Sequence, residues 1–277
     1  MSGIDDFEGK SALITGAADG IGAALAGALR AAGARVFLSD INEEKLAATA
    51  ERLDCPSAVC DVSDEAAVAR LVDQAWDALG AVDLLCANAG VIVPGSILDL
   101  PRAEFDFCFG VNVHGVLHAV RPQVRKLRES GRVGSFLLTG SEHSLSLPAY
   151  LRPVPLHVYT MSKHAVLAIG EALRAELGPD GHGVSVLCPG PVQSGLAENS
   201  TAARPESLGD PAAVDFSKVD PDAVQELMAA YIPADQAAET ALRGLRAGAF
   251  VIPTHAFQKE DVEARHADAI AGFALIE

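Results

Sequence analysis

Positively charged side chains are scarce in this chain: 21 Lys and Arg stand against 37 Asp and Glu, for a formal net charge of -16. Nucleic acids and anionic membranes bind positive surfaces, so we expect neither as a partner. No stretch approaches the roughly 18 apolar residues that a membrane-spanning helix needs. The segment from Met1 to Asp6 is acidic and has no apolar core, so a secretory signal is not expected either.

The cysteines are five in number and lack the spacing of a metal site, so no metal is expected. They are Cys55, Cys60, Cys86, Cys108 and Cys188. Three of them, Cys60, Cys86 and Cys188, fall in apolar runs, which favours a role as small buried hydrophobic side chains. This usage fits a reducing compartment, and we expect a cytoplasmic protein. Internal repeats and low-complexity linkers are also lacking.

Hydrophobic residues make up 49% of the 277 positions, and many gather in short runs that alternate with longer helical patterns. The short runs are nearly continuous, as expected of strands covered on both faces. They lie at residues 11–14, 35–39, 57–60, 83–87, 134–139, 184–187 and 249–252. Helical patterns between them include residues 22–32, 42–53, 64–79, 111–129 and 159–177. The alternation predicts an α/β fold with a Rossmann-like, doubly wound parallel sheet of about seven strands, in a single domain of residues 1–277.

Residues 195–233 interrupt this alternation. The segment follows a predicted strand and contains Pro205, Pro211, Pro221 and Pro233. It is too long for an ordinary connection between a strand and a helix, so we expect a substrate lid there. A surface insertion without a role is the alternative. The position beyond the carboxyl end of a strand favours the lid, because ligands bind at that edge of such sheets.

A glycine-rich turn, TGAADGIG at residues 15–22, joins the first predicted strand to the first predicted helix. Gly16 permits a tight turn, Gly20 leaves room for a pyrophosphate, and Gly22 lets the helix pack closely on the sheet. The start of the helix then offers main-chain N–H groups and the positive end of its dipole to phosphates. The turn therefore predicts a dinucleotide-binding site.

Asp40 ends the second predicted strand. A carboxylate at this position can accept hydrogen bonds from both hydroxyls of an adenosine ribose, and it would repel a 2′-phosphate. Capping of the helix that starts near Asn42 is the alternative, and the glycine turn favours the ribose. No lysine or arginine stands at Ser39, Ile41 or Asn42 to bind a phosphate, so NAD is predicted in preference to NADP.

Tyr159 and Lys163 are four residues apart, which places them on one face of a predicted helix. A tyrosine that acts as a base near neutral pH needs its pKa lowered by roughly two to three units from about 10. The Lys163 ammonium would favour the phenolate, and a positive nicotinamide would add to this effect. The spacing alone favours an ordinary surface pair. Ser141, directly after the fifth predicted strand, and Asn112 supply further polar groups and change that judgement.

Together these motifs resemble the short-chain dehydrogenase/reductase family. The resemblance covers about residues 7–195 motif by motif and the remainder by general layout. It rests on the turn at 15–22, the NAG element at 88–90, Asn112, Ser141, Tyr159 with Lys163, and the segment PGPVQS at 189–194.

The resemblance implies a catalytic tetrad. Tyr159 would accept a proton in alcohol oxidation and donate one in ketone reduction. Lys163 would lower the pKa of Tyr159 and bind the nicotinamide ribose. Ser141 would position the substrate oxygen, and Asn112 would hold a water that links Lys163 to solvent. Hydride would pass directly between the substrate carbon and the nicotinamide.

The predicted NAD site draws on residues that follow several strands. They are Gly16, Asp19, Gly20, Ile21, Gly22, Asp40, Ile41, Asp61, Val62, Asn88, Ala89, Gly90, Tyr159, Lys163, Pro189, Gly190, Val192 and Ser194. Asp61 and Val62 could contact the adenine, and the Pro-Gly segment would lie against the nicotinamide. Ala87 replaces the asparagine that usually precedes the NAG element, and Ser194 replaces a frequent threonine.

The chain from Ser141 to Tyr159 is longer than is common in the family, and the added residues, within 144–157, border the expected substrate pocket. The residues expected to contact the substrate are Ser141, His143, Leu147, Tyr150 and Tyr159. For His143, a structural role in its loop is equally compatible. The largely apolar surroundings predict a hydrophobic, bulky secondary alcohol or ketone of aryl, terpenoid or steroid-like type.

We therefore predict a NAD-dependent secondary-alcohol dehydrogenase. A biosynthetic ketoreductase that works mainly in the reducing direction is the alternative within the same fold. A non-catalytic dinucleotide-binding regulator is a third hypothesis, but such proteins usually lose the tyrosine or the lysine, and this chain keeps both. The resemblance also implies a homotetramer or homodimer that pairs the helices bearing Asn112 and Tyr159.

Overall fold

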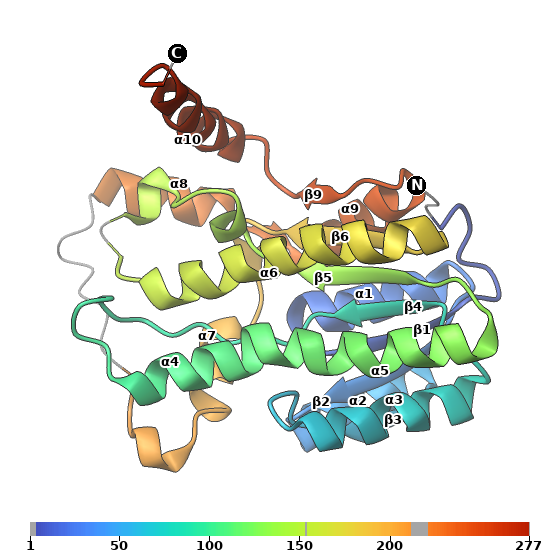
Figure 1. The fold of residues 1–277 in the computed structure, drawn as a ribbon. Helices are drawn as coiled ribbons and strands as arrows, with labels where there is room; N and C mark the ends of the chain where they lie inside the picture. The colour runs from blue at the N-terminus through green and yellow to red at the C-terminus, as the bar shows by residue number, and fades with distance from the viewer. Residues whose placement is uncertain (1–3, 153, 212–220, 277) are drawn as a thin grey trace.

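The computed structural model of the protein describes residues 4–152, 154–211 and 221–276. Its centre is a seven-stranded sheet in which all neighbouring strands run parallel, in the order β3-β2-β1-β4-β5-β6-β9 (Figure 1). The strands are β1 (Ser11–Thr15), β2 (Arg35–Asp40), β3 (Ser57–Val59), β4 (Leu84–Ala87), β5 (Ser135–Thr139), β6 (Gly183–Cys188) and β9 (Val251–Pro253). Each predicted strand is present, so the Rossmann-like, doubly wound α/β fold is confirmed.

Alternate residues of the strands enter two separate cores, one on each face of the sheet. In β1, Leu13 lies in one core, while Ala12 and Ile14 lie in the other. In β5, Phe136 and Leu137 divide in the same way. Because side chains of a strand point alternately to opposite faces, burial on both faces requires the continuous apolar runs of the sequence.

Helices cover both faces of the sheet (Figure 1). The first core includes side chains of α3 (Glu65–Leu79), α5 (Gly115–Ser130) and α6 (His157–Leu177). The second includes side chains of α1 (Gly20–Ala31), α2 (Glu43–Leu53) and α9 (Ala234–Arg246). Polar caps start several of them: Asp19, Asn42 and Asp64 accept main-chain N–H bonds at the beginnings of α1, α2 and α3.

One predicted helix boundary was wrong. The helix expected at 111–129 belongs to a longer helical run that begins at Arg102, directly after Pro101. The run consists of α4 (Arg102–Phe109), the π-helical turn η1 (Gly110–His114) and α5. In the π turn, the N–H of Gly115 bonds to the carbonyl of Gly110, which widens the helix at Asn112. Such turns often occur at functional sites.

The order of the strands reverses direction between β1 and β4. From β1 the chain adds β2 and β3 on one side, and from β4 it adds β5, β6 and β9 on the other. The loops after β1 and β4 therefore separate at this point and leave a crevice beyond the carboxyl ends of the strands. The glycine turn follows β1 and the NAG element follows β4, so both lie at the place where such sheets bind ligands.

The segment predicted as a lid contains α7 (Leu196–Ala202), the 3₁₀ helix η5 (Glu206–Leu208) and α8 (Pro221–Ala230), and residues 212–220 of it lie outside the described residues. A two-stranded parallel sheet of β7 (Val192–Gln193) and β8 (Ile232–Pro233) joins the two ends of the segment. Arg204, near η5, forms a bidentate ion pair with Glu104 of α4, and both side chains are at most 10% exposed.

The last helix, α10 (Gln258–Phe273), projects from the body of the molecule near the carboxyl end of the chain (Figure 1). Its first turns are attached to the 3₁₀ helices η2 (Glu142–Ser144) and η3 (Ala149–Leu151) and the residues beside them: the N–H of Ala149 bonds to Asp261, and Arg265 bonds to the carbonyl of Leu145. In the part of the chain that the structure describes, no helix is long and apolar enough to cross a membrane.

Candidate active site

The glycine-rich turn forms a cradle in which Gly16, Gly20 and Gly22 have no room for a side chain. Gly16 has a φ of 64°, and a Cβ there would lie 2.7 Å from the Cα of Ala89. A Cβ on Gly22 would collide with the carbonyl oxygen of Gly16. A Cβ on Gly20 would lie 2.8 Å from the Cβ of Ser194, so the turn directly meets the Pro-Gly segment that follows β6. The cradle opens at the start of α1, where main-chain N–H groups can bind phosphate.

The NAG element holds this turn in place. The Asn88 amide donates to the carbonyls of Thr15 (3.1 Å) and Gly16 (3.0 Å), and its oxygen accepts from Thr139 (3.0 Å). The side chain of Asn88 therefore links the glycine turn to the end of β5. The sequence did not predict this structural role. A Cβ on Gly90 would lie 3.3 Å from both the Asn112 Oδ1 and the Lys163 Nζ, so this glycine leaves the space where the predicted cofactor and catalytic residues meet.

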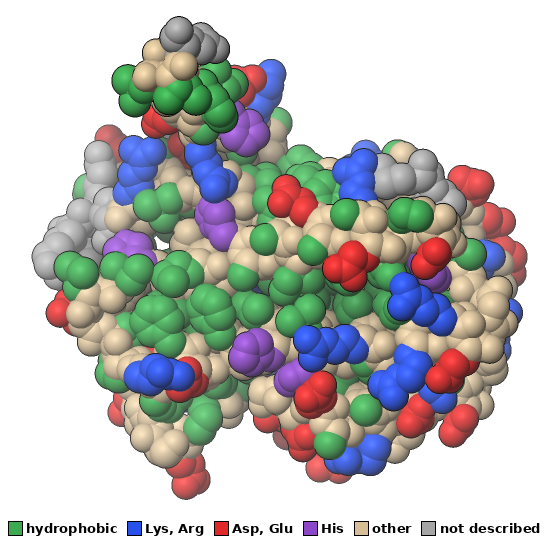
Figure 2. All heavy atoms as spheres, viewed as in Figure 1, with side chains coloured by type: hydrophobic (Ala, Val, Ile, Leu, Met, Phe, Trp, Pro, Cys, Tyr) green, Lys and Arg blue, Asp and Glu red, His purple; other side chains and the backbone are tan. Residues whose placement is uncertain are grey.

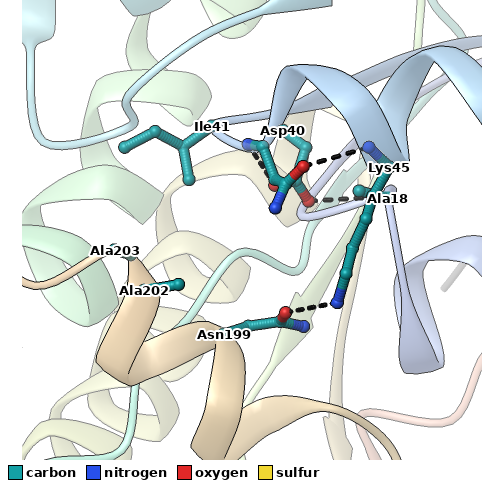
Figure 3. A pocket seen from close by; sticks show the side chains of 8 residues that line it. Ala18, Asp40, Ile41, Lys45, Asn199, Ala202 and Ala203 are labelled. Atoms are coloured by element: carbon teal, nitrogen blue, oxygen red, sulfur yellow. Dashed lines mark hydrogen bonds between the residues drawn. The ribbon is translucent and has the colours of Figure 1, made fainter.

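Asp40 lies at the end of β2, where its carboxylate accepts the N–H of Ala18 (3.0 Å) and the N–H of Asn42 (2.9 Å). It lines a pocket of about 240 Å³ between the glycine turn, α2 and α7 (Figure 3). The pocket residues are Ala18, Asp40, Ile41, Asn42, Lys45, Asn199, Ala202 and Ala203. Asn42 is the N-cap of α2, so the alternative role of Asp40 as the cap itself is not seen. Each Asp40 oxygen keeps a lone pair for a ligand hydroxyl.

Lys45 is the cationic residue of this pocket, and the sequence argument missed it. Its ammonium lies 2.7 Å from Asn199 Oδ1, a contact drawn in Figure 3, and 3.1 Å from Asp19 Oδ2, and Asn199 also donates to Asp19 (3.1 Å). The three residues tie the start of α1 to α2 and α7. Burial raises the pKa of Asp19, but the hydrogen bonds from Asn199 and Lys45 outweigh it and lower the pKa below its usual value. The signal in the sequence was a lysine five residues after Asp40, in the first turn of the helix that follows the strand.

Tyr159 and Lys163 are both buried on α6, with the Lys163 Nζ 5.7 Å from the centre of the Tyr159 ring. The ammonium donates to the carbonyl of Thr139 at the end of β5 (2.8 Å). Burial lowers the pKa of Lys163 to about 8. The predicted pair on one helix face is therefore present, and the end of β5 orients the lysine.

The pKa of Tyr159 differs from the expectation. In the protein alone it lies above the usual value, because burial disfavours the phenolate and this outweighs the hydrogen bond with Ser141, which lowers the pKa. The nearby Glu142 carboxyl raises it further. The lowering that we expected from Lys163 does not prevail without additional positive charge beside the phenol.

Ser141 caps the short 3₁₀ helix η2 and accepts the N–H of His143 (3.2 Å). The neighbouring Ser144 is used structurally, because its hydroxyl donates to the carbonyl of Lys163 (2.7 Å) and accepts the N–H of Ser141 (3.1 Å). Ser141 rather than Ser144 is thus the serine that acts on the Tyr159 phenol, whose pKa it lowers.

Asn112 lies in the π turn and braces the loop after β4. Its Oδ1 accepts the N–H of Val91 (2.7 Å), and its Nδ2 donates to the carbonyl of Val91 and to the hydroxyl of Ser162, each at 2.9 Å. Both amide hydrogens are used by the protein, and Oδ1 keeps one lone pair. Asn112 thereby joins the widened helix, the NAG loop and α6, which carries Tyr159 and Lys163.

The residues expected around the substrate have different environments. His143 is buried, bonds through Nδ1 to Thr160 (2.7 Å), and lies edge-on to Tyr159 with the ring centres 5.3 Å apart. Burial lowers the pKa of His143 to about 4, so the ring is neutral. Leu147 is 38% exposed. The Tyr150 hydroxyl donates to Glu142, so that polar group is already used within the protein.

An apolar cluster surrounds the Tyr159 ring. Val154 and Leu156 of the added segment are buried against it, and Ile92, Leu151 and Val224 pack on the same cluster. Val224 comes from α8, so the segment predicted as a lid contributes to the wall beside the tyrosine.

The remaining predicted cofactor residues surround the same edge of the sheet. Ile41 is 47% exposed in the Asp40 pocket. Asp61 accepts the N–H of Ser63 in a turn (2.8 Å), and Val62 is buried beside Gly115. Both residues therefore also have structural roles besides the predicted contact with adenine. Ile21 is half-buried against the second core, and the Ala89 N–H bonds to the hydroxyl of Thr15.

The Pro-Gly segment is supported from the chain's last strand and helix. The N–H of Gly190 donates to Thr254 (3.1 Å), and a Cβ on Gly190 would lie 2.6 Å from Gln258 and 2.7 Å from His255. The carbonyl of Pro189 accepts the N–H of Glu142 (2.7 Å), and Val192 pairs with Ile232 in the small sheet. Gln258 had no motif by which the sequence could identify it. Among the described residues, no group of three or more His, Cys, Asp or Glu could hold a metal ion.

A parallel sheet with a glycine cradle at its reversal point, and a serine, tyrosine and lysine beside it, defines a nucleotide-binding oxidoreductase. The family model for short chain dehydrogenases matches residues 10–205. The chain belongs to the short-chain dehydrogenase/reductase family, as its motifs predicted, and is an oxidoreductase of the type that acts on alcohols.

Among its relatives is a 1-deoxy-11-beta-hydroxypentalenate dehydrogenase of Streptomyces avermitilis, 38% identical over 202 residues, which are 70% of this chain and 73% of that protein. Versicolorin reductase stcU of Emericella nidulans is 35% identical over 205 residues, which are 71% of this chain and 75% of that reductase. A solved short-chain dehydrogenase/reductase from Burkholderia phymatum, in complex with NAD, superposes with a TM-score of 0.85 at 32% identity and covers 96% of each chain.

Proposed function

We propose that the protein is a NAD-dependent dehydrogenase that transfers hydride between NAD and a hydrophobic, bulky secondary alcohol or its ketone, with Tyr159 as the general acid and base. The observation that carries this proposal is the Tyr159 phenol, which is buried in an apolar cluster on the same helix face as Lys163, with the Ser141 side chain acting to lower its pKa. A buried phenol beside an ammonium and a serine hydroxyl is suited to proton transfer with an apolar substrate.

The residues at the carboxyl edge of the sheet fit a dinucleotide. The glycine cradle at 16–22 would take the pyrophosphate, Asp40 the adenosine ribose, and Lys163 the nicotinamide ribose. The space left by Gly90 in front of Lys163 Nζ agrees with this placement. When bound, the oxidised nicotinamide supplies the hydride acceptor and a positive charge that favours the Tyr159 phenolate.

The protein's own groups would then move the proton. Ser141 orients the substrate oxygen toward Tyr159, which takes the hydroxyl proton during oxidation and returns it during reduction. Lys163 is largely protonated at neutral pH and favours the phenolate. The free lone pair of Asn112 Oδ1 lies at Gly90, close to Lys163, and could hold the water that connects the lysine to solvent.

NAD rather than NADP is supported by the charges in the Asp40 pocket. The Asp40 carboxylate would repel a 2′-phosphate. Lys45 could attract one, but its ammonium is already paired with Asp19 and bonded to Asn199. A phosphate would have to compete with both partners of Lys45 while it lies beside Asp40.

The apolar cluster around Tyr159 supports a hydrophobic substrate. A hydroxypentalenate dehydrogenase among the relatives agrees with a terpenoid-like alcohol, and a versicolorin reductase agrees with the biosynthetic ketoreductase as the second candidate. We also propose that residues 195–233 act as the substrate lid of a single domain. The small β7–β8 sheet, the buried Arg204–Glu104 pair and the contact of Val224 near Tyr159 support this role.

We further propose a homodimer or homotetramer that pairs the surfaces of α4, α5 and α6. Figure 2 shows apolar side chains gathered between α4 and α6, and Met161 on α6 is 39% exposed. The five cysteines form no disulfide, which agrees with a reducing compartment such as the cytoplasm.

The proposed mechanism is tested by Tyr159→Phe, which removes only the phenolic oxygen. We expect turnover of any oxidised alcohol to fall by about 10²–10⁴-fold, the usual contribution of general acid–base catalysis, while NAD binding measured by calorimetry stays unchanged. Normal turnover by Tyr159→Phe would show that the mechanism is wrong, and NAD binding without turnover of any substrate by the wild type would favour the regulator.

A further inference from the structure

Glu142 is a buried carboxyl directly beside the catalytic serine, and the proposed mechanism does not use it. It is 4% exposed. The Tyr150 hydroxyl donates to Oε1, and the Gln258 amide donates to Oε2 at 3.0 Å. Its own N–H donates to the carbonyl of Pro189 in the Pro-Gly segment (2.7 Å). Three parts of the chain, at 142, 150 and 258, therefore converge on this one group.

Within residues 4–152, 154–211 and 221–276, no Lys, Arg or His forms an ion pair with Glu142. The titratable groups that act on it are Tyr150, which remains protonated because burial raises its pKa, and Asp261 of α10. Burial raises the pKa of Glu142 to about 7, against the hydrogen bonds from Tyr150 and Gln258. Glu142 thus changes charge in the neutral range.

Apart from Glu142 and Lys163, the titratable groups beside Tyr159 do not change their charge near neutral pH. His143, edge-on to its ring, is neutral, and burial raises the pKa of Cys108 to about 11. Near neutral pH the charges beside the phenol are therefore those of Lys163 and Glu142, and the carboxylate opposes the loss of the Tyr159 proton.

We propose that Glu142 is a positioning residue for Tyr159: held between Tyr150 and Gln258, its carboxyl supports the Ser141 turn and controls by its charge the pH at which Tyr159 exchanges a proton. The inference rests on the proposed function. It also gives α10 a role, because Gln258 in its first turn is one of the two groups that hold the carboxyl.

Glu142→Gln is a clean test because the site can accommodate it. The Gln258 Oε1 is buried without a hydrogen-bond partner, so a rotation of that amide would let it accept from the new side-chain NH₂ group. Gln can still accept the Tyr150 hydroxyl through its own oxygen. The substitution therefore removes the charge and keeps the clamp. Glu263→Gln is the matched control, since it removes an exposed charge on α10 that acts on neither Glu142 nor Tyr159.

The first measurement is kcat/KM for alcohol oxidation against pH. Oxidation needs the phenolate, so loss of the neighbouring negative charge should move the acid limb to lower pH by up to about one unit. One unit below the wild-type midpoint, Glu142→Gln would then be about fivefold faster than the wild type. Glu263→Gln should follow the wild-type profile. A profile for Glu142→Gln that superimposes on that of the wild type would overturn this inference, whereas lack of turnover by the wild type would overturn the proposed function itself.

The second measurement is thermal unfolding between pH 5 and pH 8, which needs no substrate. A folded-state pKa raised above the unfolded value means that Glu142 contributes stability below about pH 4.5 that is lost as the pH rises through about 7. Gln does not titrate, so the Tm of Glu142→Gln relative to the wild type should rise from pH 5 to pH 8. A difference that is constant with pH would show that Glu142 does not change charge in this range, and the inference would fail.

Discussion

Replacing Asp40 by alanine should change the cofactor preference more than any other single substitution in the Asp40 pocket. In the structure each carboxylate oxygen accepts one main-chain N–H, from Ala18 and from Asn42, and keeps one lone pair for a ribose hydroxyl. The substitution removes the acceptors for the ribose and, with them, the support of the glycine turn. Weaker support of the glycine turn affects NAD and NADP alike. The ratio of the activity with NAD to the activity with NADP therefore reports only the loss of the ribose acceptors.

The magnitude follows from the interactions that differ between the cofactors. A net hydrogen bond to a charged group contributes about 1.5–3 kcal/mol, so losing two such bonds to the ribose should lower kcat/KM with NAD by at least about 100-fold. Removing the repulsion between a carboxylate and a 2′-phosphate at the pocket surface should raise kcat/KM with NADP by about tenfold. The ratio of NAD to NADP activity would therefore fall by at least about a thousandfold, the product of these two changes.

The assay is the formation of reduced cofactor with NAD and NADP in parallel, on one alcohol at one ionic strength. Lys45→Met in the Asp40→Ala background is the informative control. If Lys45 binds the phosphate once Asp40 is gone, the double variant should lose the gain with NADP. Equal use of both cofactors by the wild type, or an unchanged ratio in Asp40→Ala, would refute the assigned role of the carboxylate.

The remaining predictions concern the lid and the assembly. Glu104→Gln leaves the Arg204 charge buried without a carboxylate, which should lower the free energy of unfolding by about 3–5 kcal/mol. The Tm should then fall by about 5–9 °C. If only the lid opens, the chain near Arg204 should instead become sensitive to protease. Asp106→Asn breaks the exposed pair with Arg102 on the same helix and should cost less than about 0.5 kcal/mol; equal behaviour of the two variants in both assays would contradict the structural role of the buried pair. Light scattering should give a dimer or tetramer, and a mass of 28.7 kDa would refute the proposed assembly.

The strands and the glycine turn could be predicted because each depends on residues close together in the chain. A strand covered on both faces must be apolar throughout, and Leu13 and Ile14 meet this requirement within one short run. The helical repeat alone brings Tyr159 and Lys163 to one face. The helix boundary at Arg102 was missed because the π turn at residues 110–114 joins α4, which packs in a small cluster with Val91 and Val93, to α5, which packs in the first core.

The sequence by itself determined the family and the parallel α/β fold, and it predicted the tetrad, since motifs of neighbouring residues carry that information. Only the tertiary structure decided the partners of Glu142 and Lys45: Gln258 is 116 residues from Glu142, and Asn199 is 154 residues from Lys45. It also decided the direction in which the pKa of Tyr159 moves. That direction depends on how completely the phenol is buried and on which charges surround it, and burial is a property of packed elements that no local pattern contains.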